Sequence, residues 1–294
     1  MHVIEVSDTA ALVRIRNGCL NVSVDGTTLG SVPVAEVSAV LLSSPHATCS
    51  VAAIASLAGQ GTPVIFCDPS MKPAGMVLPF RGHHGIGQRV LAQANAAVPL
   101  RKRLWKQLIQ SKIIGQAAAL ESVRGNDAGL RLLAKRVRSG DTSNVEARAA
   151  RRYWGGLFGR GFRRRRGEGV VNRMLDYGYA VLRACIARSI CVSGLHPSIG
   201  IHHHNRANAF ALADDLIEPY RPAVDQKVVA CLRLFPETDE LTSVQKKELA
   251  AALRMTVPLD GCSRSVEDAA KRSAASLAGA FLGGPEKLSL PWIG

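Results

Sequence analysis

The sequence predicts an α+β protein, with a small β-rich N-terminal domain at residues 1–80 and a larger all-α domain at residues 97–294. Two observations predict this fold class. Short segments of alternating or β-branched residues, separated by turn signals, fill the first 80 residues. From Gln88 onward, apolar residues instead recur at three- and four-residue spacing, which is typical of helices. At 294 residues the chain is long enough for two domains or one large one.

The N-terminal domain is predicted from its strand patterns and two local signals. Asn17-Gly18 lies between two strand patterns and strongly favours a tight hairpin. Ser50 is placed to cap a short apolar helix that continues through Ala58 and ends at Gly59. The predicted strands cover residues 3–6, 12–15, 20–24, 37–42 and 63–67.

A linker and a series of helices are predicted for the rest of the chain. Gly, Pro and His are frequent at residues 73–87, and we place the linker between the domains at residues 81–96. Asn144 is expected to cap a helix that runs past Tyr153. Further helical patterns cover residues 90–97, 104–120, 170–192, 207–218, 222–233, 243–254 and 265–282.

Charge is distributed unevenly between the two predicted domains. The chain carries 37 Lys and Arg against 23 Asp and Glu, a formal charge of +14. Residues 1–80 hold only three of the basic and five of the acidic side chains, so the positive charge belongs to the C-terminal part. Such asymmetry indicates a polyanionic partner there. The alternative is a basic surface that serves only solubility.

Cysteine usage and hydropathy indicate the compartment. The seven cysteines include no C-x-x-C pair, and several lie in apolar segments, as buried free thiols of a reducing cytosol do. No uninterrupted apolar run reaches the roughly 18 residues of a membrane span. The first residues lack the pattern of a signal peptide. We therefore expect a cytoplasmic protein with no membrane partner.

The densest group of polar residues begins with His202-His203-His204-Asn205 and continues with Asp214, Asp215 and Glu218. On a helix, Glu218 lies three and four positions after the two aspartates, so all three are expected on one side. Carboxylates and an imidazole that converge form a site for a divalent cation. The alternative is a solvated acidic face, which the apolar residues around the acids make less favourable.

Glu146 is the best further carboxylate for such a site, although spacing alone favours a simpler role. It lies at a predicted helix start, where an acid is stabilised by the helix dipole and nearby arginines. Tyr153 follows seven residues later, two turns along the helix, and is expected to face whatever Glu146 faces.

A glycine-flanked arginine cluster follows this helix. Arginine forks bind phosphates without regard to base sequence, and the flanking glycines indicate a flexible loop. A solvated charged loop is the alternative, but nucleic-acid contact is the favoured interpretation. The predicted DNA-binding residues are Arg148, Arg160, Arg163, Arg164, Arg165 and Arg166.

Four segments of the chain resemble a known family, the integrase of CRISPR adaptation, which is the universal Cas protein that inserts new spacers. The sequence around the histidines is most similar to that of the members found in type II systems. The β-rich start of the chain is also similar to that family's N-terminal domain. The segments are NVEARAARRYW at 144–154, VNRMLDYGYAVL at 171–182, GLHPSIGIHHHN at 194–205 and LADDLIEPYRP at 212–222.

The resemblance implies a catalytic metal site. Glu146, one histidine and Glu218 would hold Mg²⁺ or Mn²⁺, and Asp215 would lie close by. The pattern G-x-x-H-x-N of the type II members, laid on Gly200 and Asn205, selects His203 as the ligand rather than His204. Asn205 and His204 are then expected near the site, without an assigned role.

The resemblance also implies a reaction and partners. A 3′-hydroxyl of incoming double-stranded DNA would attack a phosphodiester of the CRISPR repeat, so that spacers are inserted by transesterification. Homodimers formed through the β-rich domain would be bridged by a second, small adaptation protein. The alternatives are a hydrolytic DNA-repair nuclease and a non-catalytic basic module that binds nucleic acid.

Overall fold

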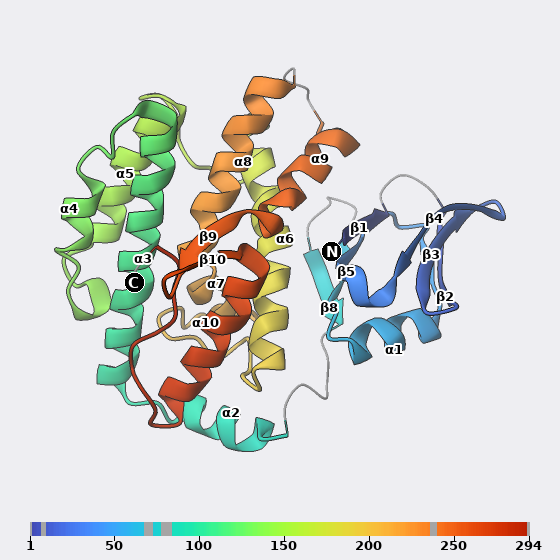
Figure 1. Cartoon of the computed structure of the whole chain (residues 1–294), viewed down its shortest axis with the longest axis horizontal. Helices are drawn as coiled ribbons and strands as arrows, with labels where there is room; N and C mark the ends of the chain where they lie inside the picture. The colour runs from blue at the N-terminus through green and yellow to red at the C-terminus, as the bar shows by residue number, and fades with distance from the viewer. Residues whose placement is uncertain (1, 7–9, 68–72, 78–83, 236–239, 293–294) are drawn as a thin grey trace. The chain divides into compact units, whose positions relative to one another are not determined.

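The chain divides into two compact units, Met1–His84 and Gly85–Gly294. The first contains mainly strands and the second mainly helices (Figure 1), which confirms the predicted fold class. The unit boundary falls inside the linker predicted at residues 81–96, but most of that segment is a helix rather than an irregular connection. The computed structural model describes residues 2–6, 10–67, 73–77, 84–235 and 240–292.

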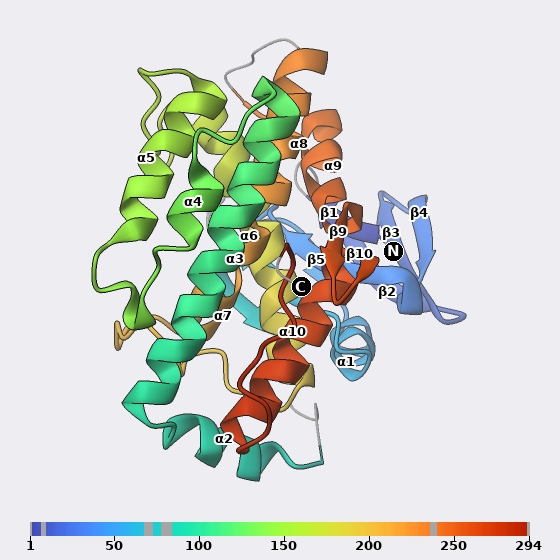
Figure 2. The same cartoon turned by 60° about the vertical axis from the view of Figure 1, so that its left-hand side comes forward.

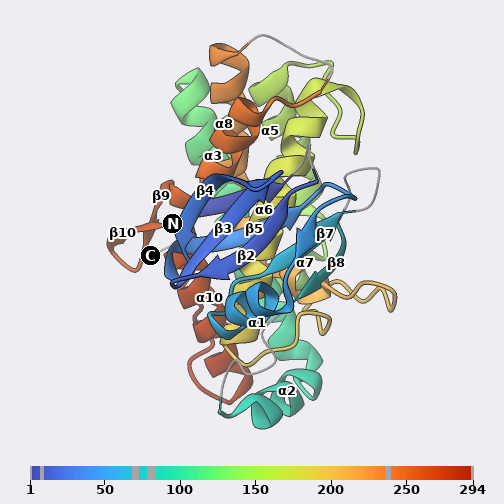
Figure 3. The same ribbon diagram turned by 90° about the vertical axis from the view of Figure 1, so that its right-hand side faces the viewer.

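Unit 1 forms two four-stranded sheets within its described residues, in the orders β1-β5-β7-β8 and β4-β3-β2-β6. Helix α1 packs on β2 and β7 (Figure 3). The strands are β1 His2–Val6, β2 Leu12–Arg16, β3 Cys19–Val24, β4 Thr27–Pro33, β5 Val37–Leu42, β6 Thr48–Cys49, β7 Val64–Cys67 and β8 Pro73–Val77, and the helices are α1 Val51–Gly59 and a 3₁₀ turn at Val34–Glu36.

Both local signals in unit 1 are confirmed. Asn17 and Gly18 adopt φ of 49° and 72° and join β2 to β3 in an antiparallel hairpin, because positive φ at both turn residues matches the twist of the strands. The Ser50 hydroxyl accepts a hydrogen bond from the Ala53 amide at 3.2 Å and so caps α1. Leu57 of that helix is fully buried in the core of the unit.

Unit 2 is built around α3, a helix of 27 residues. Helices α4 and α5 pack on it side by side (Figure 2), and α8 also contacts it. The α-helices are α2 Ile86–Ala94, α3 Val98–Arg124, α4 Leu130–Ala134, α5 Val145–Phe158, α6 Gly169–Val192, α7 Ala211–Leu216, α8 Arg221–Leu234, α9 Ser243–Ala250 and α10 Val266–Phe281. The 3₁₀ turns are η2 Ser139–Asp141, η3 Glu218–Tyr220 and η4 Ala251–Arg254.

Unit 2 departs from the sequence prediction in a hairpin, in the additional short helix α4 and at both ends of α7. A hairpin, β9 Thr256–Leu259 with β10 Cys262–Ser265, makes the unit largely helical rather than all-α. The helix predicted through Glu218 ends at Leu216, and Glu218 begins η3 instead. Pro219 has no amide hydrogen to donate to a regular helix, so the backbone tightens there.

Among the described helices, none combines the length and the apolar character that crossing a bilayer requires.

Candidate active site

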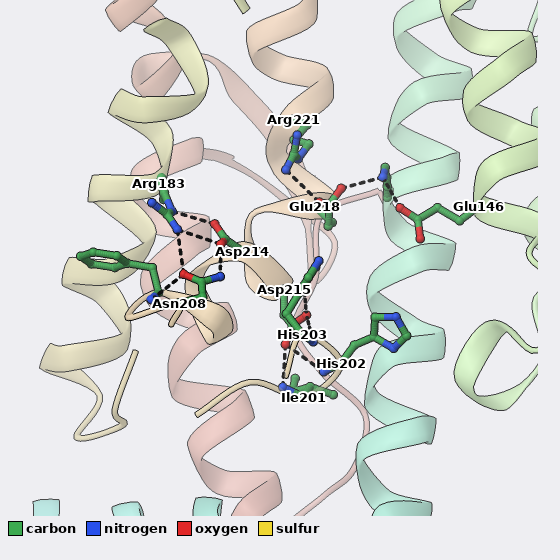
Figure 4. A network of polar contacts seen from close by, with 12 residues as sticks. Glu146, Arg183, Ile201, His202, His203, Asn208, Asp214, Asp215, Glu218 and Arg221 are labelled. Atoms are coloured by element: carbon green, nitrogen blue, oxygen red, sulfur yellow. Dashed lines mark hydrogen bonds and ion pairs between the residues drawn. The ribbon is translucent and has the colours of Figure 1, made fainter. Parts of the chain in front are cut away.

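Two of the three predicted metal ligands converge on a single cationic side chain. Lys112, which is buried on α3, places its Nζ 2.5 Å from Glu146 Oε1 and 2.6 Å from Glu218 Oε2. Glu146 comes from α5 and Glu218 from η3, and dashed lines in Figure 4 join both to a side chain of α3. Three segments far apart in sequence therefore meet at one point through their charges.

The start of α5 places Glu146 toward this point. Asn144 adopts a left-handed conformation, with φ of 49°, and its side chain accepts from the Ala147 amide at 3.4 Å. Asp141 accepts from the amides of Val145 and Glu146 at 2.9 and 3.0 Å. Because these two side chains satisfy the exposed amides of the first turn, the Glu146 carboxylate is left to reach across to α3.

Glu218 is buried and remains ionised because two cations face it. Arg221 Nη2 lies 3.0 Å from Glu218 Oε1, on the opposite side of the carboxylate from Lys112. Burial by itself would raise the pKa of Glu218, but Arg221 and Lys112 outweigh it and hold the pKa below its ordinary value. Burial would likewise lower the pKa of Lys112, and Glu218 and Glu146 reverse that effect, so the lysine stays protonated.

Asp215 fixes the loop that carries the histidines. Its carboxylate is fully buried and accepts from the amides of Ile201, His202 and His203 at 2.6, 2.9 and 3.2 Å. Gly200 allows this close approach, since a side chain there would overlap the carbonyl oxygen of His203. Asp215 is thus a buried support of the loop that carries His203.

His203 is oriented by the same aspartate. Its Nδ1 lies 2.6 Å from Asp215 Oδ1 (Figure 4), and because carboxylate oxygens act as acceptors we assign Nδ1 as the donor. This hydrogen bond raises the pKa of His203, and burial opposes the shift. Nε2 is then the nitrogen that can bind a metal, in the arrangement by which carboxylates orient metal-binding histidines.

The neighbouring residues of the triplet have other environments. The His202 ring stacks on Trp105 of α3, with centroids 4.2 Å apart and planes 4° from parallel. His204 and Asn205 are exposed, and Asn205 accepts from the Ala207 amide at 3.0 Å. The structure therefore separates the three histidines, with only the His203 ring hydrogen-bonded to Asp215.

The three acids predicted to share one side of a helix have three different partners. The Arg183 guanidinium binds both oxygens of Asp214 at 2.7 Å, and Asn208 donates to Asp214 at 2.7 Å. Asp215 supports the histidine loop, and Glu218 faces Lys112. The spacing argument was wrong on this point, because the α-helix ends before Glu218.

Tyr153 lies behind the site rather than beside Glu146. Its ring is fully buried, and its hydroxyl donates to Asp225 at 2.7 Å. Tyr179 donates to the other oxygen of the same carboxylate. Burial raises the pKa of Asp225 to about 6, although the two hydroxyls and Arg221 oppose the shift.

The donor set suits a divalent cation, although its members are not yet in ligand positions. Within the described ranges, no three His, Cys, Asp or Glu side chains are arranged to hold a metal ion. Glu146 and Glu218 nevertheless already converge on one positive charge, that of Lys112. Two carboxylates and an imidazole are ligands that Mg²⁺ and Mn²⁺ accept, so the chemistry of these residues fits such an ion.

The sequence alone did not identify Lys112, Trp105 or Arg221 as site residues. Lys112 interrupts an apolar helix face beside Ile113, and a lysine there is rarely buried unless it is paired, which was a usable signal. Trp105 offered no such signal, because its partner His202 is distant in the sequence. Arg221 offered none either, because its partner Glu218 was already assigned as a metal ligand.

The arginine loop divides into one internal and several exposed side chains. Arg164 is half-buried, donates to Asn172 at 3.0 Å and pairs with Asp176. Its guanidinium also lies 5.5 Å from the centroid of the Tyr179 ring. The other predicted DNA-binding residues are exposed: Arg148, Arg160, Arg163, Arg165 and Arg166.

Comparisons with known proteins place the chain among related sequences. The family model described as CRISPR associated protein Cas1 matches residues 4–240. The CRISPR-associated endonuclease Cas1 of Neisseria meningitidis serogroup C (strain 8013) is 35% identical over 233 residues, covering 78% of this chain and 76% of the relative. These matches confirm the resemblance seen in the sequence.

Solved structures share the fold over nearly the whole chain. A Cas1 protein from Thermotoga maritima has a TM-score of 0.78 at 18% identity and covers 97% of this chain and 98% of its own. A casposase bound to integration product has a TM-score of 0.78 at 20% identity, covering 98% and 93%. A Cas6-RT-Cas1–Cas2 complex has a TM-score of 0.72 at 17% identity, covering 97% and 35%.

Proposed function

Because the chain belongs to the Cas1 family of CRISPR-associated proteins, we propose that it is a DNA integrase and endonuclease that depends on Mg²⁺ or Mn²⁺. In this proposal it inserts new spacers into a CRISPR array. A 3′-hydroxyl attacks a repeat phosphodiester and a second 3′-hydroxyl is released, so one phosphodiester bond replaces another without an external energy source.

The observation that carries the proposal is the convergence of Glu146 and Glu218 on one cation, with His203 oriented nearby by Asp215. A bound divalent cation supplies Lewis-acid polarisation of the scissile phosphate and lowers the pKa of the attacking hydroxyl. The ligands we assign to it are Glu146, His203 Nε2 and Glu218.

The chain's own residues prepare these ligands. Arg221 keeps Glu218 ionised despite its burial, so a charged oxygen is available without a pH change. Asp215 holds the His203 ring through Nδ1 and thereby keeps Nε2 unprotonated while the ring is neutral. Lys112 lies between the two carboxylates and reduces the repulsion between them.

We propose double-stranded DNA as the substrate and a second adaptation protein as a partner. The exposed arginines 148, 160, 163, 165 and 166 supply phosphate contacts next to the helix that carries Glu146. The likeness to a chain of a Cas1–Cas2 complex supports a larger assembly with a Cas2-type protein. A homodimer formed through unit 1 completes this assembly.

A strand-transfer assay with Mn²⁺ tests the proposed function. The variants Glu146→Ala, His203→Ala and Glu218→Ala are each expected to lose at least about 100-fold in joining rate, because each removes a ligand. Glu121→Ala is the matched control, since it removes an exposed acid of α3 that pairs only with Arg131 in the described contacts. Joining at the wild-type rate by all three variants would refute the assigned metal ligands, whereas DNA binding without any joining by the wild type would favour a non-catalytic module.

The state of the DNA end separates an integrase from a hydrolytic repair nuclease. A donor with a blocked 3′-hydroxyl is expected to abolish joining by the wild type, because the hydroxyl is the nucleophile. A hydrolase uses water and cuts equally well with either end. If free and blocked donors gave equal amounts of product, the protein would be a hydrolase rather than an integrase.

A further inference from the structure

The segment after α10 runs along one stripe of α3. Its residues 286–292, which we call the C-terminal strap, meet α3 side chains spaced one helical turn apart. Arg103 binds the Glu286 carboxylate at 2.6 and 2.7 Å, and Gln107 donates to the Glu286 carbonyl oxygen and accepts from the Leu288 amide, both at 2.9 Å. The Ser111 hydroxyl donates to the Pro291 carbonyl oxygen at 2.5 Å.

Gly115 continues this stripe and makes room for the last described residue. A Cβ at Gly115 would lie 2.6 Å from Nε1 and 2.8 Å from Cδ1 of the Trp292 indole. Trp292 itself has φ of 70°, a conformation that a tryptophan keeps only when its surroundings impose it. The helix surface and the indole are therefore closely fitted to each other.

The strap also reaches the turn that carries Glu218. The Trp292 indole N–H donates to the carbonyl oxygen of Pro219 at 3.1 Å, and Pro219 directly follows Glu218. A second connection runs from the Ser289 carbonyl oxygen through the Ser273 hydroxyl to the Tyr220 hydroxyl, which lies 2.6 Å from Ser273. Two successive residues of η3 are thus held by the strap.

We propose that the C-terminal strap is a positioning element of the active site, which holds η3 against α3 so that Glu218 stays opposite Lys112. The strap contacts α3 at Ser111, the neighbour of Lys112, and η3 at Pro219, the neighbour of Glu218. It lies beyond residue 240, where the match to the family model ends. Its effect on metal binding rests on the proposed function, whereas its effect on η3 does not.

Two substitutions disturb the strap without touching a ligand. Gly115→Ala places a methyl group against the indole, and Trp292→Phe keeps an aromatic ring but removes the donor to Pro219. The control is Gly279→Ala on α10, where an added Cβ meets no atom within 4 Å. Both alanine variants gain the same helix propensity, so a difference between them reports the contact with Trp292.

Amide hydrogen exchange measures directly whether the strap holds η3 in place. In Gly115→Ala and Trp292→Phe, the amides of residues 217–221 are expected to exchange at least about 10-fold faster than in the wild type, because local opening is no longer opposed by the strap. Gly279→Ala is expected to match the wild type. Unchanged exchange in both strap variants would overturn the proposal, whether or not the protein binds metal.

Calorimetric titration with Mn²⁺ measures whether the strap supports metal binding. Both strap variants are expected to bind Mn²⁺ on the order of 10-fold more weakly, as for the loss of a residue that orients a ligand. A strap that only stabilises the fold would lower the melting temperature and leave the affinity for Mn²⁺ unchanged, which would also overturn the proposal. No binding of Mn²⁺ by the wild type would instead refute the proposed function, and the exchange experiment would still decide on the strap.

A double variant tests whether both substitutions act through the same contact. Trp292→Ala removes the atoms that the Gly115→Ala methyl group would meet. The double variant is therefore expected to exchange no faster at residues 217–221 than Trp292→Ala alone. Additive effects would show that Gly115→Ala does not act through its contact with Trp292, and would contradict the proposed fit between α3 and the strap.

Discussion

A buried lysine between two glutamates is the residue that distinguishes this site. Lysine is almost never fully buried unless it is paired, and here both carboxylates are within 2.6 Å of Lys112 Nζ. The same two carboxylates are proposed to hold the divalent cation. The ammonium and the metal are therefore competitors for one pair of ligands, and the stability of the protein without metal should depend on Lys112.

Lys112→Met tests this competition. Without metal, the variant is expected to lose about 1–3 kcal/mol of stability, because the buried Glu218 and the partly exposed Glu146 lose the ammonium between them while Glu218 keeps Arg221. Added Mn²⁺ is expected to raise the melting temperature of the variant more than that of the wild type, since the metal restores the missing charge. Thermal unfolding in EDTA and in Mn²⁺ measures both effects.

Lys102→Met is the control for that experiment, because Lys102 lies on the same helix but is exposed. It should behave as the wild type in both conditions. An equal metal-induced shift in the Lys112→Met variant and the wild type would contradict the competition.

Asp225 predicts a pH dependence of stability. Its pKa is about 6 in the folded protein against an ordinary value of 3.8, so the folded state binds more protons between about pH 4 and 6. The raised pKa of Asp225 therefore stabilises the folded protein at about pH 4, and this contribution is lost as the pH rises toward 6. As the pH rises from about 4 to 6, the free energy of unfolding of Asp225→Asn should increase by about 1–3 kcal/mol relative to that of the wild type.

Denaturant unfolding of both proteins between pH 4 and 6.5 provides the measurement. Subtracting the two curves removes the titration of all other groups, which include the cationic Arg221 and Lys112 near Asp225. In the variant, one of the two tyrosine hydroxyls that bond Asp225 can donate to the amide oxygen and the other can accept from the amide nitrogen. A difference that does not vary with pH would show that Asp225 is ionised throughout.

The sequence predicted the site residues to different degrees. Spacing alone proposed Asp215 and Glu218, and both are buried at the site, but with separate partners. Glu146 and the choice of His203 depended on family resemblance, because their partners Lys112 and Asp215 are brought close only by tertiary folding. Their roles as metal ligands stay predictions. No local pattern reports that a charge on one helix is met by a charge from another.

At the scale of elements, helical periodicity located most of the helices of unit 2, and turn chemistry located the β2–β3 hairpin. Asn17-Gly18 correctly marked a hairpin, and Asp260-Gly261 carried the same signal for β9–β10 in a segment that the helical patterns left open. Strand β4 was missed because most of it is exposed and its sequence lacks a regular apolar alternation. The end of α7 was missed because Pro219 acts on the residues before it.

The arginine loop gives a prediction at this scale. Changing Arg163, Arg165 and Arg166 to alanine is expected to weaken DNA binding and to reduce the slope of log K against log salt by about 2–3, since each phosphate contact contributes about 0.9. Arg164 is left intact, because its contacts with Asn172 and Asp176 hold the loop to α6. Binding isotherms at several salt concentrations supply the slope.

The control for the loop is Arg164→Ala, which should lower the thermal stability by loosening the loop from Asp176. It removes the same charge as any one of the exposed arginines. A salt slope that is unchanged in the triple variant would assign DNA binding to another surface.

At the scale of the whole molecule, the two units differ in charge as well as in fold. Residues 1–80 carry more acidic than basic side chains, whereas the helical part carries the excess of Lys and Arg. DNA contact therefore belongs to the helical unit in our proposal, and the N-terminal unit is left for association with a second copy. The sequence predicted this division because composition changes where the fold changes.

The assembled state of the protein tests that division. The chain has a mass of 31.3 kDa, and light scattering on the purified protein is expected to give about twice that value. Reversing charges on the arginine loop should leave this mass unchanged, because the loop belongs to the DNA-binding unit. A monomeric mass, or one that depends on the loop, would contradict dimerisation through unit 1.

The strap finally has a consequence for when the enzyme becomes competent during its synthesis. Arg103 and Glu286 are separated by 183 positions in the sequence. At typical translation speeds the ribosome needs about 10–40 s to add that many residues. In the last part of this interval, after Glu218 has been added, the nascent chain carries both glutamates but lacks the segment that holds one of them in place. Synthesis order would thus delay nuclease activity until the helical unit is nearly complete.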